Sequence, residues 1–202
     1  MKADTHEELK HDFNAFREEC IQLKHLVNTH SWLFKGGEAQ DKLLMNAGGG
    51  FFQELSGWMT ELYILRVCRL TDPPGKAGRY NLTTQALVKR LEQLKPSLDS
   101  ELAALAEINA RLVGYQELLK DARNKRVAHF DLASSRSSES LGVHSQDELL
   151  RFQIDLQSFC DAVGRYIGEG PLDYGATGYD GDALSLIKHL ERCAENRADA
   201  EE

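Results

Sequence analysis

The stretch 120–131, which reads KDARNKRVAHFD, contains residue types that could cleave a phosphodiester. Cleaving RNA without a metal requires removal of a proton from a ribose 2′-hydroxyl, stabilisation of charge on phosphorus, and protonation of the leaving 5′-oxygen. His129 suits the proton transfers because the ordinary pKa of histidine, about 6.5, lies near working pH. Arg123 suits the phosphate because a guanidinium stays charged and can hold two oxygens at once. Asn124 could orient the phosphate or the imidazole.

Three further cations surround these residues, namely Lys120, Lys125 and Arg126, and they could bind RNA through its phosphates. The whole chain nevertheless carries a net charge of −8 with histidine neutral. An acidic chain is not expected to offer a broad nucleic-acid-binding surface, because such surfaces draw on clustered Lys and Arg. The sequence therefore predicts at most a narrow basic cleft.

The spacing of Arg123 and His129 limits how one helix could present them. The two residues are six positions apart, which is about 240° around a straight α-helix at about 100° per residue. They would not share a face. Either the helix bends or ends between Asn124 and His129, or the site takes its arginine and its histidine from two copies of the chain.

A long amphipathic helix is expected to position this stretch. Apolar residues recur upstream of it at intervals that make one helical stripe: Leu98, Leu102, Leu105, Ile108, Leu112, Tyr115, Leu119 and Ala122. The next positions of the stripe are Arg126 and His129, so the apolar face becomes cationic and titratable just before the pattern ends. The serine-rich segment 134–138 then reads as a loop.

Arg123 and Asn124, followed by His129 on a late helix, resemble the signature of the HEPN superfamily. The wording of this stretch is most similar to the abortive-infection, AbiU-type branch, and the segment 69–73, Arg-Leu-Thr-Asp-Pro, is similar to another part of that branch. The resemblance implies the catalytic roles described above and RNA products with 2′,3′-cyclic phosphate ends. It also implies a homodimer whose motifs face each other, and it implies no metal or cofactor.

The supporting residues leave ordinary alternatives open. Arg69 and Asp72 end a core helix whose tail could lie near Arg123, or they could form a helix end in which the cation complements the dipole. Asp131 could support the site, or Arg123 could simply pair with Asp121, Asp131 or an acid elsewhere in an ordinary structural contact. The histidine of the motif could likewise cap helix carbonyls.

Helical stripes follow one another along the chain, and no segment alternates convincingly with period two. They predict an all-α, HEPN-like up-and-down bundle of about five or six helices over residues 1–168. A glycine-rich loop and a last helix, residues 169–202, are expected to pack as an appendage. The expected helix caps are Asn81 or Thr83, Ser145 with Glu148, and Asp180 or Asp182. The helix after Gly48 has a wide apolar arc, which predicts neighbours on more than one side.

Composition narrows the class of protein. With 42% hydrophobic and 28% charged residues, the 202-residue chain is typical of globular proteins. No apolar run approaches the ~20 residues that span a bilayer, and the first residues lack the apolar core of a signal peptide. A cytoplasmic protein without membrane contact is expected. The four cysteines show no spacing typical of zinc and are expected to be free, mostly buried thiols, so no metal site is predicted.

Two functions of different kinds remain open. The first is a metal-independent endoribonuclease of a toxin–antitoxin or antiviral abortive-infection system, with RNA as substrate. The second is a catalytically silent HEPN dimer that binds a protein, such as an antitoxin, or a nucleotide-like ligand. A basic cleft converging on His129 would favour the enzyme, whereas a motif closed by intact salt bridges would favour the binding module.

Overall fold

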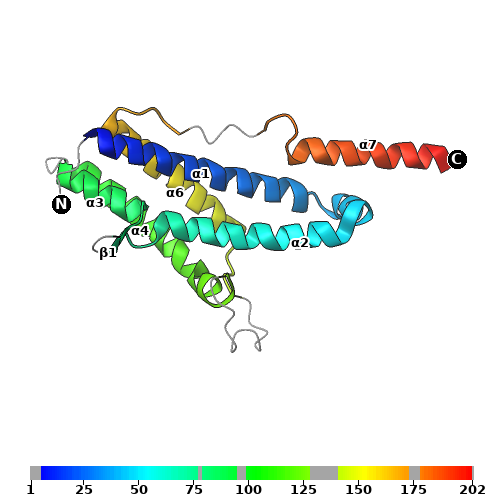
Figure 1. Cartoon of the computed structure of the whole chain (residues 1–202), viewed down its shortest axis with the longest axis horizontal. Coiled ribbons are helices and arrows are strands. Elements are labelled where there is room, and N and C mark those ends of the chain that lie inside the picture. Colours follow the sequence, from blue (N-terminus) through cyan, green and yellow to red (C-terminus); the bar gives the residue numbers. More distant parts are fainter. Residues whose placement is uncertain (1–5, 77–78, 95–98, 128–140, 173–177, 202) are drawn as a thin grey trace. The chain divides into compact units, whose positions relative to one another are not determined.

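The computed structural model describes residues 6–76, 79–94, 99–127, 141–172 and 178–201. Helices dominate these residues (Figure 1), so the predicted all-α class is confirmed. The described elements are α1 (His6–Phe34), α2 (Glu38–Thr71), β1 (Gly75–Lys76), β2 (Arg79–Tyr80), α3 (Thr84–Leu94), α4 (Asp99–Ala122), the π-helical turn η1 (Arg123–Val127), α6 (Gln146–Ile167) and α7 (Ala183–Glu201). The short antiparallel hairpin of β1 and β2 differs from the sequence analysis, which predicts no strand.

Residue contacts divide the chain into two compact units. Unit 1 comprises Met1–Gln22 and Ile64–Tyr174, and unit 2 comprises Leu23–Tyr63 and Gly175–Glu202. The last helix, α7, therefore belongs to a unit that also contains parts of α1 and α2. The sequence-based division after residue 168 differs from this one and stays a prediction.

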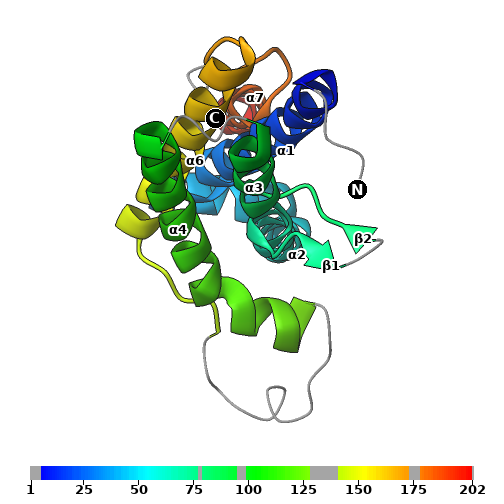
Figure 2. The same ribbon diagram turned by 90° about the vertical axis from the view of Figure 1, so that its left-hand side faces the viewer.

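The core of unit 1 takes side chains from every helix in it. Fully buried residues include Phe13 and Phe16 of α1, Val67 of α2, Leu87 and Leu91 of α3, Leu112 and Leu119 of α4, and Phe159 and Val163 of α6. Figure 2 shows α4 beside α6. The Arg111 guanidinium on α4 donates to both carboxylate oxygens of Asp155 on α6, which fixes the two helices to each other.

The stripe predicted for residues 98–122 is the buried face of α4. Its buried members are Leu102, Leu105, Leu112, Tyr115, Leu119 and Ala122. Ile108 is half-buried, and Leu98 lies outside the described residues. Directly after Ala122 the helix widens into η1, and in Figure 2 the last turns run in a different direction from the first part of α4. The helix thus changes geometry where the candidate motif begins.

Side-chain caps begin three helices where the sequence predicts them. Thr83, rather than Asn81, caps α3, since its Oγ1 accepts from a first-turn amide at 3.2 Å. Ser145 Oγ accepts from the Glu148 amide at 3.1 Å, and Glu148 Oε2 accepts from the Ser145 amide at 2.6 Å, which is the predicted capping box of α6. These bonds from Ser145 hold the pKa of Glu148 below its ordinary value. Asp182 accepts from a first-turn amide of α7 at 2.9 Å.

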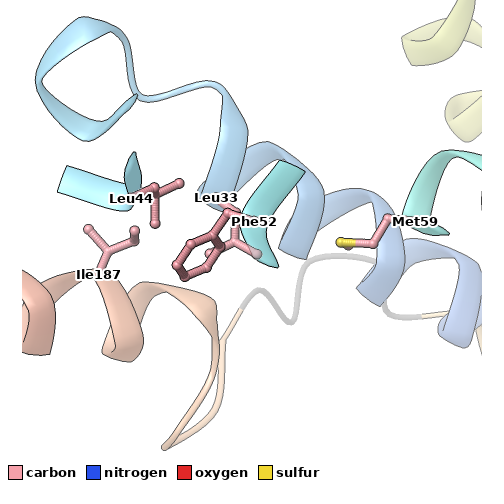
Figure 3. Close-up of a cluster of buried hydrophobic side chains, with 5 residues drawn as sticks. All are labelled: Leu33, Leu44, Phe52, Met59 and Ile187. Carbon is pink, nitrogen blue, oxygen red and sulfur yellow. The ribbon is translucent and has the colours of Figure 1, made fainter. Parts of the chain in front are cut away.

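Unit 2 has a small core of its own. Leu33 of α1, Leu44, Phe52 and Met59 of α2, and Ile187 of α7 form a buried cluster (Figure 3). Gly48 has non-helical dihedral angles, φ 167° and ψ 62°, so α2 is kinked there. The adjoining face of α2, about 100° away from Phe52 and Met59, stays exposed, with Phe51 at 58% and Trp58 at 55%. The expectation that α2 has neighbours on more than one side is therefore wrong at these two residues, because no described segment covers them.

Candidate functional site

Asp72 joins two predicted parts of the site. Its Oδ2 accepts from Nη2 of Arg123 at 2.8 Å, and its Oδ1 accepts from Nε2 of Gln116 at 2.7 Å. Arg123 also donates a longer bond of 3.4 Å to Oδ1 of Asn124. The end of α2 thus lies against the start of η1. The sequence leaves open whether Asp72 lies near Arg123, and the structure shows that the two side chains are in contact.

The backbone around Asp72 explains why this carboxylate is well placed. Asp72 follows the last residue of α2, and Pro73 cannot continue a helix. Two side chains from the α3 region then hold the helix end: Gln85 donates to the Thr71 carbonyl at 2.8 Å, and Asn81 donates to the Pro73 carbonyl at 3.2 Å. Asp72 is therefore flanked on both sides by tethered backbone.

Burial decreases from Gln116 to Asp72 to Arg123. Gln116 is 4% exposed, whereas the side chains of Asp72 and Arg123 are 17% and 34% exposed. A poorly hydrated carboxylate needs hydrogen-bonding partners, and these two donors supply them. Nearby, burial raises the pKa of the Cys68 thiol, and the Asp72 charge adds to this effect against smaller opposing effects of Arg123 and Gln116. The thiol is therefore neutral at pH 7.

The other predicted cations have acidic neighbours. Lys120 and Lys125 each pair with a carboxylate one turn earlier in the helix, at 2.9 and 2.8 Å. Both side chains remain more than two-fifths exposed, at 49% and 42%, and Arg126 is exposed on η1. Arg69 pairs with Glu19 at 3.4 Å rather than with Asp72. The cations of α4 and η1 could thus reach a phosphate, while Arg69 is held elsewhere.

His129 and Asp131 lie outside the described residues. The chain is described again from residue 141, and Gly142 packs closely on α4, since a Cβ there would lie 2.9 Å from Cβ of Ala122. The turn η1 forms hydrogen bonds five residues back instead of four, so each residue advances by less than the ~100° of an α-helix. The separation of about 240° expected from a straight α-helix assumes α-helical geometry after Arg123, and residues 123–127 form a π-helical turn instead.

Gln116 is the residue of this cluster that the sequence analysis misses. It stands beside Tyr115 at the edge of the apolar stripe, where a single glutamine reads as a solvated position. The signal that could have found it is its spacing: Gln116 precedes Arg123 by seven residues, about two helical turns. Both side chains therefore face the same neighbour, which is the tail of α2.

The family model described as AbiU2, a HEPN family, matches residues 6–186. That span covers most of the 202 residues and includes the Asp72, Gln116 and Arg123 cluster. The chain belongs to the AbiU2 family of HEPN proteins. The predicted membership is confirmed. No curated protein and no solved structure matches the chain.

Other features of this AbiU2 chain lie apart from the cluster. Within the described ranges, no helix is long and apolar enough to cross a membrane, and no group of His, Cys, Asp and Glu residues could hold a metal ion. Cys20, Cys68 and Cys160 are buried thiols outside any disulfide of the described residues, and Cys193 is exposed. A cavity of about 360 Å³ is lined by residues of α1, the hairpin and α3, including Tyr80 and Arg90. None of the predicted site residues lines it, so it is not part of the candidate site.

Proposed function

We propose that this AbiU2 protein is a metal-independent endoribonuclease of an abortive-infection or toxin–antitoxin system. The observation that carries the proposal is that Arg123 is anchored through Nη2, by a hydrogen bond to Asp72, while 34% of its side chain stays exposed. A guanidinium has five N–H donors. Asp72 accepts one bond, and Asn124 accepts a long one. Donors therefore remain for the oxygens of a phosphate.

In the proposed mechanism, Arg123 holds the scissile phosphate and stabilises the charge that develops on its oxygens. The ribose 2′-oxygen loses its proton and attacks phosphorus, which forms a 2′,3′-cyclic phosphate, and the 5′-oxygen leaves with a proton. His129 serves these proton transfers, and Asn124 orients the phosphate. The neighbouring cations of α4 and η1 attract RNA electrostatically.

The proposal includes a homodimer in which two copies of the region around η1 approach one shared cleft. Membership of a HEPN family supports this arrangement, because the resemblance to that superfamily implies motifs that face each other across a dimer. Light scattering at micromolar concentration should give the mass of two chains. A monomer that still cleaves RNA would remove the shared cleft and leave the roles of Arg123 and His129 in place.

A cleavage assay on single-stranded RNA with chelator present tests the activity. His129→Ala and Arg123→Ala should each lower the rate by about 10²–10⁴-fold, because each removes a group that acts in the transition state. His189→Ala, a change at an exposed histidine of α7, is the matched control and should cleave like the wild type. Circular dichroism checks that every variant is folded. Equal background cleavage by the wild type and His129→Ala would contradict the proposal.

A second candidate is a catalytically silent dimer that binds a protein partner or a nucleotide-like ligand. The ion pair between Asp72 and Arg123 favours this second candidate, because the carboxylate offsets the positive charge of Arg123 that would bind a phosphate. The net charge of −8 points the same way. This reading predicts no RNA cleavage by the wild type under any salt or pH condition, together with binding that survives His129→Ala.

A further inference from the structure

We propose that Gln116 is a positioning residue that determines how many donors Arg123 can offer to a phosphate. The inference rests on the proposed function and adds a residue that touches neither RNA nor the reacting atoms. Gln116 is 4% exposed, and its Nε2 donates to Oδ1 of Asp72 at 2.7 Å. Arg123 contacts the other oxygen, Oδ2, at 2.8 Å.

The inference rests on the observation that the two carboxylate oxygens of Asp72 accept from different donors. A carboxylate and an arginine usually pair most strongly through two parallel N–H···O bonds, which would occupy a whole edge of the guanidinium. Gln116 opposes that arrangement, because it draws Oδ1 toward α4 and leaves Oδ2 for Arg123. Asp72 then anchors the guanidinium through one nitrogen. The guanidinium keeps N–H groups beyond those donated to Asp72 and Asn124, and 34% of the Arg123 side chain is exposed.

The surroundings of Gln116 hold it in this role. It lies on the buried side of α4, and the Cys68 thiol is a hydrogen-bonding neighbour from α2. Among the described residues, the titratable and charged groups around the site include the Cys68 thiol of α2, the Asp72 carboxylate directly after it, Arg123 of η1, and Glu117, Lys120 and Asp121 of α4 itself. An amide in this position donates a hydrogen bond to Asp72 without adding charge among them.

Removal of the amide should let Asp72 rotate and pair with Arg123 through both oxygens. Labelling with phenylglyoxal, which attacks free guanidinium groups, reports this directly when the modified peptide is quantified by mass spectrometry. Gln116→Leu should slow modification of Arg123 by about 5-fold, the factor that one net hydrogen bond contributes. Simple loosening of the structure would speed modification instead. A faster or unchanged rate in Gln116→Leu therefore overturns the inference.

The same labelling shows whether Gln116 acts through Asp72. Asp72→Ala should speed modification of Arg123, and Gln116→Leu added to Asp72→Ala should cause no further change. An additional effect in the double variant would contradict a role through the carboxylate. Gln157→Leu, at a half-buried glutamine of α6 that donates to the Leu172 carbonyl, is the matched control and should leave Arg123 labelling unchanged.

Gln116→Glu provides a second test that can still be carried out if Gln116→Leu does not fold. A protonated carboxyl can donate to Asp72 as the amide does, and burial beside a second carboxylate raises its pKa. Labelling of Arg123 relative to the wild type should therefore be near unity at about pH 5 and fall as pH rises, since the ionised group attracts the guanidinium. A ratio that is constant with pH overturns the inference. Labelling needs no RNA, so these outcomes remain decisive if the wild type does not cleave it.

Discussion

Arg123 is held by a carboxylate that is itself held by a buried amide, and this order of contacts determines what each substitution should do. In the chain of contacts from Gln116 through Asp72 to Arg123, Gln116 is buried and about one third of the Arg123 side chain is exposed. Changes at Asp72 therefore act on the direction of the guanidinium. Changes among the exposed cations should act on the proposed attraction for RNA, because these side chains project from α4 and η1 next to the anchored arginine.

Asp72→Asn should slow RNA cleavage by about 10–100-fold, because a small displacement of a positioned group has an effect of that order. Asparagine offers one acceptor oxygen to two donors, so either Gln116 or Arg123 loses its bond. RNA affinity should stay the same or rise, since a negative charge near the phosphate is removed. Asp121→Asn makes the same change of charge at a carboxylate that pairs with Lys125, and it is the control. Equal loss of rate in both variants would contradict a specific role for Asp72.

Lys125→Ala should weaken RNA binding with little effect on the rate at saturating RNA. Removal of one phosphate-contacting cation reduces the slope of log affinity against log salt by about one. Filter binding in the His129→Ala background, over a range of salt concentrations, measures that slope. Lys188→Ala, at an exposed lysine of α7, should leave it unchanged. A loss of affinity that does not depend on salt would argue against a phosphate contact at Lys125.

At the scale of the element, the end of α4 depends on the segment that packs against it. The helix widens into η1 directly after Ala122, and π-helical turns occur often at functional sites. Gly142 lies on this helix end with φ +74° and leaves no room for a side chain. The packing of Gly142 is therefore expected to support the geometry of the turn that carries Arg123.

Gly142→Ala should lower the free energy of unfolding by about 1–3 kcal/mol, because alanine is strained at positive φ and its Cβ would meet Ala122. Gly168→Ala is a close control, since Gly168 has the same φ of +74° but open space around it. Urea unfolding should show a larger loss for Gly142→Ala, and the difference measures the clash. Equal losses for the two variants would mean that the contact with Ala122 is easily relieved.

At the scale of the whole molecule, the two units should respond separately to changes in their cores. Ile187 of α7 is 7% exposed in the core of unit 2, and Val163 of α6 is fully buried in unit 1. Ile187→Ala should destabilise its unit by about 2–5 kcal/mol through the cavity that it leaves. Amide hydrogen exchange should rise in residues 23–63 and 178–196 while the region around Asp72 and Arg123 keeps its protection.

Val163→Ala is the counterpart of that experiment. It should raise exchange in the described helices of unit 1 and leave the protection of unit 2 in place, because each cluster is packed within its own unit. If either variant instead raises exchange throughout the chain, the two units unfold as one cooperative structure.

The features that the sequence alone determined are those with local physical causes. The stripe of α4 follows from helical period, and Ser145 caps α6 because its side chain reaches an amide within the first turn. For α3 and α7 the sequence limits the cap to Asn81 or Thr83 and to Asp180 or Asp182, and the structure selects Thr83 and Asp182. Family membership likewise follows from the pattern of the chain. The stripe and the caps depend on residues that are three or four positions apart, so they can be predicted without knowledge of the fold.

Tertiary structure alone decided the pairing at the candidate site and the exposure of α2. Asp72 and Arg123 are separated by 51 positions and meet only because the tail of α2 packs on the end of α4. Gln116 reads as a surface residue until that packing buries it against Asp72. The exposure of Trp58 likewise depends on the tertiary structure. An apolar arc indicates which side chains can be buried, but a side chain is buried only where another segment packs against it.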